Sequence, residues 1–164
     1  MEKVKLSSII RVVSNKKRVE SFPGSNLEFY TNYAMVVSET LKKPLFQRFL
    51  DWVLKREDIE RKHVRDIQVR LLPFQKENGK FLAGRCNNKG VIRIFPKRLN
   101  FLRKRFQNNG KEKVQFYLES RAMATLIHEL LHVKYAANES KVKQLTRKYF
   151  GIFINHTNQT LSKV

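Results

Sequence analysis

Residues 124–133 read ATLIHELLHV, and this short apolar stretch decides how the rest of the chain is interpreted. On a helix, residues i and i+4 lie one above the other, so the imidazoles of His128 and His132 can reach one ion. Glu129 follows the first histidine and is close enough to accept a proton from a water molecule on that ion. Unpaired polar groups in so apolar a helix would be costly, which favours a metal site over two surface histidines on an amphipathic helix.

A catalytic zinc site needs a third protein ligand, because it usually keeps three and leaves one position for water. After His132 the sequence contains only one acidic residue, Glu139, and only one histidine, His156. On one straight helix Glu139 would lie about 10 Å along the axis from His132, too far to share an ion. The helix is therefore expected to end near residues 135–137, with Asn138 capping the next helix and Glu139 in its first turn. We favour Glu139 as the third ligand, and His156 remains the alternative.

The stretch HELLHVKYAANES, residues 128–140, resembles the active-site region of short zincins, in which an HExxH helix is followed closely by a third ligand. In gluzincins that ligand is a glutamate, commonly written NE, and Asn138-Glu139 matches this pattern. SprT-like peptidases place a histidine there instead, and the minigluzincins are the most similar in size. The resemblance covers residues 66–150. It implies a zinc metalloendopeptidase with one Zn²⁺ per chain, a protein or peptide substrate, and Glu129 as general base.

The growing oxyanion of peptide hydrolysis needs a hydrogen-bond donor besides the metal, and Tyr135 and His156 are the candidates. In zincins an edge strand pairs with the extended substrate, and the segment Gly90–Phe95 resembles that strand. A latent peptidase held inactive by its own N- or C-terminal segment is a further alternative suggested by the minigluzincins.

The predicted fold class is α+β, a zincin-like core with an added N-terminal helical region. Residues 1–65 form the predicted basic arm and helical region, and residues 66–164 the metallopeptidase core, packed as one compact domain. The first 24 residues are interpreted as a flexible extension, a short strand or a cover for the active site. A helix capped by Asn26 and a second helix from Pro44 to about Arg61 follow, the second with a buried stripe of Leu45, Phe49, Trp52 and Val53.

Three short strands are expected in the middle of the chain. Alternation of apolar and polar residues predicts a strand from Ile67 to about Pro73, and turn signals at residues 77–80 and 87–90 separate two more, Lys80–Arg85 and Val91–Phe95. We expect an antiparallel meander. Helices are predicted over residues 98–106, over 111–135 and from Asn138 onward, the last burying Val142, Leu145 and Tyr149 before a tail from Gly151.

The chain is strongly basic, with 34 lysines and arginines against 14 acidic residues and a formal net charge of +20. Such an excess attracts polyanions, so DNA or RNA is a candidate partner, and the alternative function is a nucleic-acid-binding protein with a structural or regulatory zincin core. Arg103, Lys104 and Arg105 form the best single basic patch. Phe101 and Phe106 beside them suit base stacking, although core packing is the commoner role.

The single cysteine, Cys86, cannot form an internal disulfide and fits a reducing compartment. The N-terminus has no apolar run of secretory length, and no stretch approaches the roughly 20 apolar residues that span a bilayer. We therefore expect a cytoplasmic protein without a membrane span.

Overall fold

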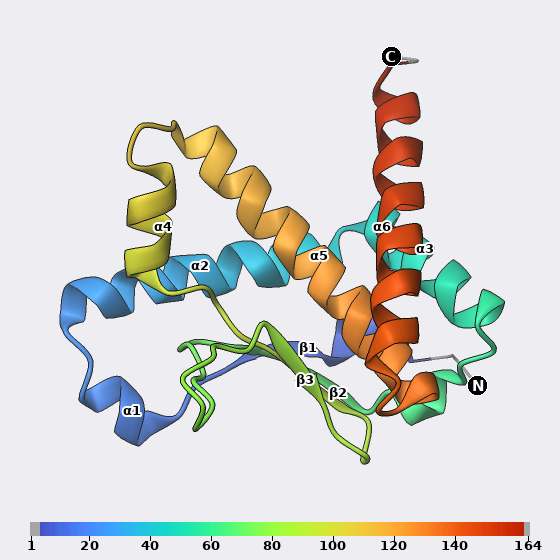
Figure 1. The fold of residues 1–164 in the computed structure, drawn as a ribbon, viewed down its shortest axis with the longest axis horizontal. Helices are drawn as coiled ribbons and strands as arrows, with labels where there is room; N and C mark the ends of the chain where they lie inside the picture. The colour runs from blue at the N-terminus through green and yellow to red at the C-terminus, as the bar shows by residue number, and fades with distance from the viewer. Residues whose placement is uncertain (1–3, 163–164) are drawn as a thin grey trace.

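The computed structural model describes residues 4–162, with side chains through residue 158. Over this range the fold is α+β, with six α-helices and a small mixed sheet of four strands (Figure 1). In chain order the elements are the 3₁₀ turn Leu6–Ile9, β1 Ile10–Val13, α1 Lys16–Glu20, α2 Gly24–Lys42, α3 Pro44–Arg56, the 3₁₀ turn Arg61–His63, β2 Asp66–Arg70, β3 Gly84–Cys86, β4 Val91–Ile94, α4 Leu99–Phe106, α5 Lys111–Tyr135 and α6 Glu139–Ser162.

The strand order in the sheet is β1-β2-β4-β3, which corrects the predicted antiparallel meander. Strand β2 is parallel to both β1 and β4, and only the β3–β4 pair is antiparallel. The chain leaves the sheet after β2 and returns as β3 at the outer edge, so β4 enters between β2 and β3. The 87–90 turn joins β3 to β4 as predicted, whereas the strand predicted from Lys80 is regular only over Gly84–Cys86.

The first residues of the described chain include a short strand, one of the three interpretations of the N-terminal arm. Strand β1 pairs with β2 in the register Ile10↔Ile67 and Val12↔Val69. The described part of this segment therefore belongs to the sheet and does not cover His128, His132 or Glu139.

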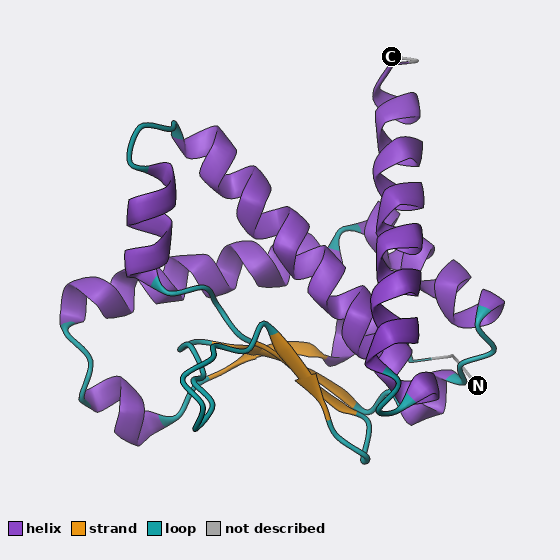
Figure 2. Cartoon of the chain, in the orientation of Figure 1, coloured by secondary structure: helices purple, strands orange, loops and turns teal. Residues whose placement is uncertain are grey.

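Two helices pack on the same face of the sheet. Figure 2 shows α2 and α5 crossing over the strands, and α6 lying beside α5. The side chains at the centre of this layer have no exposed surface: Ile67, Ile92, Leu126, Ile127 and Leu130. Burial of these apolar side chains is the main free-energy term that fixes α5 against the sheet.

The N-terminal helices differ in detail from the prediction. Helix α2 begins at Gly24, after Pro23 and before the expected cap Asn26. Pro44 occupies the first turn of α3 as expected, but the helix ends at Arg56. Its buried side is turned relative to the predicted stripe, because Trp52 is 39% exposed. The side chains that α3 buries are Phe46, Leu50, Val53 and Leu54.

The last helix is longer than predicted. Val142, Leu145 and Tyr149 are buried as expected, but the helix continues through Gly151 to Ser162 where a tail was predicted. The reason is tertiary: Phe153 is buried and its ring centroid lies 5.3 Å from that of Phe46 on α3.

No described helix is long and apolar enough to cross a membrane. The buried hydrophobic cluster contains residues from both predicted parts of the chain, 1–65 and 66–164. A boundary between these parts stays a prediction.

Candidate metal centre

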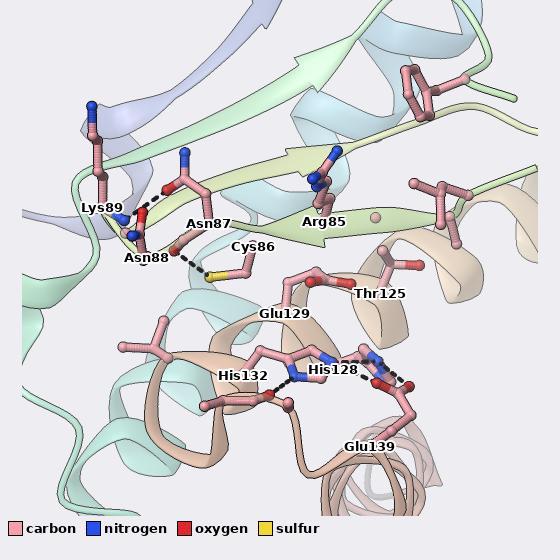
Figure 3. Close-up of a pocket in the computed structure, with 18 of the residues that line it drawn as sticks. Arg85, Cys86, Asn87, Asn88, Lys89, Thr125, His128, Glu129, His132 and Glu139 are labelled. Atoms are coloured by element: carbon pink, nitrogen blue, oxygen red, sulfur yellow. Dashed lines mark hydrogen bonds and ion pairs between the residues drawn. The ribbon is translucent and has the colours of Figure 1, made fainter. Parts of the chain in front are cut away.

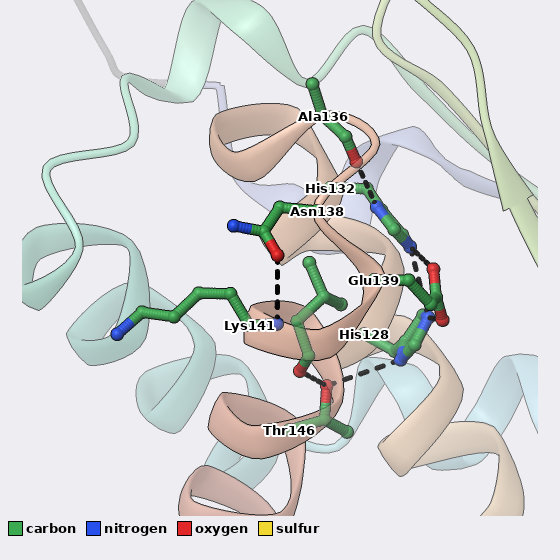
Figure 4. Close-up of polar contacts among 8 residues, drawn as sticks. His128, His132, Ala136, Asn138, Glu139, Lys141 and Thr146 are labelled. Atoms are coloured by element: carbon green, nitrogen blue, oxygen red, sulfur yellow. Dashed lines mark hydrogen bonds and ion pairs between the residues drawn. The ribbon is translucent and has the colours of Figure 1, made fainter.

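The long helix α5 ends in a tight turn that brings its histidines and the start of α6 together. Ala136 has φ 48° and ψ −121°, a left-handed backbone conformation that alanine rarely adopts. Asn138 then caps α6 by accepting a hydrogen bond from the Lys141 amide at 3.2 Å (Figure 4). The break predicted at residues 135–137 and the cap at Asn138 are therefore confirmed.

Three side chains meet at this turn. Nε2 of His128 and Nε2 of His132 are 3.1 Å apart. The Glu139 carboxylate spans both, with Oε1 3.0 Å from His128 and Oε2 3.0 Å from His132. These separations are close to the roughly 3.3 Å between ligand atoms that each lie about 2.0 Å from a tetrahedrally bound ion. The three residues form the one candidate metal-binding group among the described residues.

Backbone and hydroxyl oxygens fix the tautomer of both imidazoles. Nδ1 of His132 lies 2.6 Å from the Ala136 carbonyl, which can only accept, so this nitrogen carries the proton. The Thr146 hydroxyl donates its only hydrogen to the Val142 carbonyl at 2.7 Å, so it accepts from Nδ1 of His128 at 3.4 Å. In both rings Nε2 is therefore left with its lone pair directed at the common centre, as in metal-ligating histidines.

This donor set fits a cation. Two imidazole lone pairs and a carboxylate converge within hydrogen-bonding distance, and they repel one another unless a positive charge lies between them. Burial lowers the pKa of His128, with the charge of Glu139 opposing the shift and His132 adding to it. A neutral His128 is the form that binds a metal ion.

Glu129 lies between β3 and the histidine pair (Figure 3). Its side chain is buried, at 5% exposure, yet it lines the cleft in front of the histidines. Burial raises the pKa of Glu129 to about 7, with His132 opposing the shift and Glu139 adding to it. A carboxylate with a pKa near neutrality can both accept and return a proton.

Strand β3 comes very close to Glu129 because residue 84 is a glycine. A Cβ at Gly84 would lie 2.7 Å from Cγ2 of Thr125 and 2.9 Å from Cγ of Glu129. The segment predicted as the substrate-pairing edge, Gly90–Phe95, contains β4, which is an interior strand between β2 and β3. The edge strand beside the histidines is β3, because its hairpin folds outside β4 and against α5.

A large open cleft lies in front of this site. Its volume is about 2010 Å³, and it runs between the β3–β4 hairpin, the loop before β3 and the ends of α5 and α6. Cys86 lines it beside Glu129, and burial together with the Glu129 charge raises the pKa of the thiol to about 11. This cysteine is therefore a protonated wall residue at neutral pH.

Tyr135, predicted as an oxyanion donor, has a different position. It does not line the cleft, and its hydroxyl donates a hydrogen bond to the Glu57 carboxylate at 2.6 Å. Tyr149 donates a second hydrogen bond to Glu57, and Lys134 donates to the Glu57 backbone carbonyl. Burial acts to raise the pKa of Glu57, but these hydrogen bonds and the Lys134 charge outweigh it and hold the pKa below the ordinary value.

Glu57 has a structural role that the sequence did not indicate. Its buried carboxylate joins the end of α3 to the end of α5 and the middle of α6, the two helices that carry the candidate metal ligands. The partners are 78 and 92 residues away in the chain, so no local pattern could have indicated them.

His156, the alternative third ligand, is remote from the site. It lies 17 residues after Glu139 on α6, about 25 Å along the helix axis. The structure thus brings Glu139, and not His156, to the two histidines.

The predicted basic patch, Arg103, Lys104 and Arg105, is exposed on α4 and does not line the cleft. The two phenylalanines beside it are half-buried against Tyr117, with ring centroids 6.5 Å away for Phe101 and 5.3 Å for Phe106. They belong to the packing of α4 on α5, so the stacking role is the weaker of the two interpretations.

The chain matches no known protein-family model, and neither a curated protein nor a solved structure is significantly similar to it.

Proposed function

We propose that this protein is a zinc-dependent metalloendopeptidase of the zincin type. The observation that carries the proposal is the convergence of His128, His132 and Glu139, with Glu129 buried directly beside them. A site of two histidines and one carboxylate leaves room for water and is a common ligand set of catalytic zinc.

Zinc held by these three side chains would lower the pKa of a water molecule and polarise a carbonyl group. Glu129 takes the proton from the attacking water and delivers it to the leaving amine. Ala136 and Thr146 keep both imidazoles in the tautomer that binds zinc through Nε2. The turn at Ala136 also places Glu139 within reach of both rings.

The shape of the cleft supports a peptide substrate. Within the described chain, β3 is an edge strand, so one side of its backbone is free to pair with an extended peptide. Gly84 and Cys86 of this strand line the cleft together with Glu129. A peptide paired along β3 would run past the histidines, and the cleft is large enough to hold several residues on either side.

Peptide hydrolysis by the zinc-loaded protein tests the proposal. We expect the wild type to cleave unstructured protein such as casein, and Glu129→Gln to retain zinc while losing at least 100-fold in activity. Glu77→Gln is the matched control, because Glu77 also lines the cleft but is exposed and away from the ligands. Equal activity of the Glu129→Gln variant and the wild type would reject Glu129 as the base, and a zinc-loaded wild type that cleaves no peptide would reject the peptidase.

A further inference from the structure

The face of the sheet opposite the helices carries a row of arginines. The strand register places Arg11, Gln68, Arg93 and Arg85 side by side across β1, β2, β4 and β3. Arg70 lies two residues further along β2 on the same face. These four arginines, Arg11, Arg70, Arg85 and Arg93, are called the arginine face below.

Helices α2 and α5 do not cover this face: Arg11 and Arg85 are exposed on it, Arg70 and Arg93 are partly buried, and Gln68 between them is buried. Ile67 and Ile92 alternate with the row and have no exposed surface, because α2 and α5 pack on their side. The direction of Gly84, toward Thr125 and Glu129 on α5, shows that the neighbouring Arg85 points away from α5. Figure 3 shows the Arg85 side chain directed away from Glu129.

Positive charge on this face is nearly uncompensated. Asp66 is the single carboxylate that the four strands place here, and Arg11 pairs with it at 2.8 Å. Gln68 donates to Asp66 at 2.9 Å and accepts from Arg70 at 3.1 Å, which holds the Arg70 guanidinium in place without neutralising it. In the described chain, Arg85 and Arg93 have no carboxylate within ion-pair distance.

This arrangement opposes stability. Arg85 and Arg93 are direct cross-strand partners, and like charges in such positions destabilise an antiparallel pair. Burial lowers the pKa of Arg70, and the charges of Arg93, Arg18 and Arg11 lower it further. A surface needed only for solubility would mix both signs of charge.

The residue type also indicates a ligand. The chain has 20 lysines and 14 arginines, yet every cation in the four strands is an arginine. The planar guanidinium binds phosphate through two parallel hydrogen bonds, whereas lysine acts as a point charge. Three strand spacings of about 4.8 Å make the row roughly 14 Å wide, enough to contact several phosphates.

We propose that the arginine face binds the phosphate backbone of a nucleic-acid duplex without reading its sequence. The strands place no aromatic side chain on this face, so it offers no stacking platform for single-stranded bases. His128, His132 and Glu129 lie on the opposite side of β3 from the arginine face, and of its four arginines only Arg85 also lines the cleft. This inference is independent of the proposed peptidase activity, because it rests on a different face of the molecule.

Fluorescence anisotropy with a labelled 20-base-pair DNA duplex, measured from 50 to 300 mM salt, tests the proposal. The logarithm of the binding constant falls linearly with the logarithm of the salt concentration. Losing two phosphate contacts should make this slope shallower by about 1.8 and weaken binding about 60-fold at 0.1 M salt. We expect this loss of slope and affinity for the double variant Arg85→Gln, Arg93→Gln. The double variant Arg85→Lys, Arg93→Lys should keep the slope and lose less affinity. The matched control is Arg103→Gln with Arg105→Gln on α4, which removes the same charge from the other basic patch.

The double variant Arg85→Gln, Arg93→Gln should melt slightly above the wild type, because it removes a contact between like charges. A loss of DNA binding caused by unfolding would instead be accompanied by a lower melting temperature. The proposal is overturned if the α4 pair weakens DNA binding as much as the strand pair does. It is also overturned if poly-glutamate competes as well as duplex DNA at equal charge, which would indicate an acidic protein partner. Tighter binding of single strands than of the duplex would equally contradict it.

Discussion

Replacing Gly84 by alanine places a methyl group at a close contact between β3 and helix α5. The new Cβ would lie 2.7 Å from Cγ2 of Thr125, although carbon atoms prefer separations of about 3.5–4.0 Å. It would also lie 2.9 Å from Cγ of Glu129, which is too near the backbone to swing away freely. Strand and helix must therefore separate by roughly 0.8 Å, or Glu129 must leave its position.

Overpacking of this kind costs about 1–3 kcal/mol of unfolding free energy. For a chain of this length each kcal/mol lowers the melting temperature by roughly 2–4 °C, so Gly84→Ala should melt about 2–12 °C below the wild type. If Glu129 is the general base, a displacement approaching 1 Å also reduces kcat/KM about 100-fold. Thermal unfolding followed by circular dichroism measures the first effect, and peptide hydrolysis by the zinc-loaded protein measures the second.

Gly151→Ala is the matched control. A Cβ at Gly151 meets nothing within 4 Å inside α6, so alanine should leave the melting temperature unchanged or raise it by the helix-propensity gain of up to about 1 kcal/mol. Thr125→Ser removes the Cγ2 atom and should recover part of the loss when combined with Gly84→Ala. A Gly84→Ala protein as stable as the wild type would refute the close packing of β3 on Glu129.

Two further predictions concern residues that fix the positions of α5 and α6, the helices that carry His128, His132 and Glu139. Glu57→Gln should lower the unfolding free energy by about 1–3 kcal/mol, because the buried charge that accepts from Tyr135 and Tyr149 is lost. Since the folded pKa of Glu57 lies below its ordinary value of 4.5, its contribution is complete above that pH and falls as the pH drops through the folded pKa. Urea unfolding at pH 7 and pH 3.5 should therefore show a smaller pH effect in the variant, and equal pH effects would contradict this. Ala136→Gly should raise stability by up to about 1–2 kcal/mol, because glycine adopts a positive φ without strain, and a loss above 1 kcal/mol in the same experiment would argue against the turn.

Local patterns were sufficient to predict that His128, His132 and Glu139 lie together. The spacing of His128 and His132 and the limited reach of a straight helix required a bend before Glu139, and the structure contains that bend. The sequence gives no sign of the residue that makes it, since Ala136 is neither glycine nor asparagine. Two hydrogen bonds with His132 accompany its unusual conformation: the Ala136 amide donates to the His132 carbonyl, and the Ala136 carbonyl accepts from Nδ1 of His132.

Local sequence patterns could not predict which strands and helices, far apart in the chain, lie next to each other. The alternation around Ile67 indicated a strand but not its neighbours, so β2 was placed in a meander when it pairs in parallel with β1 and β4. A tail was predicted from Gly151, but Phe153 packs on Phe46 of α3, and α6 continues to Ser162. The arginine face has the same origin, because its members come from four strands that only the fold brings together.

A crystal of the protein grown with zinc, with diffraction measured on both sides of the zinc absorption edge, tests whether His128, His132 and Glu139 hold a zinc ion. We predict one anomalous peak per chain, about 2.0–2.2 Å from Nε2 of His128, Nε2 of His132 and a carboxylate oxygen of Glu139. The absence of a peak there, or a peak bound by other residues while these three side chains point apart, would show that they do not form a zinc site.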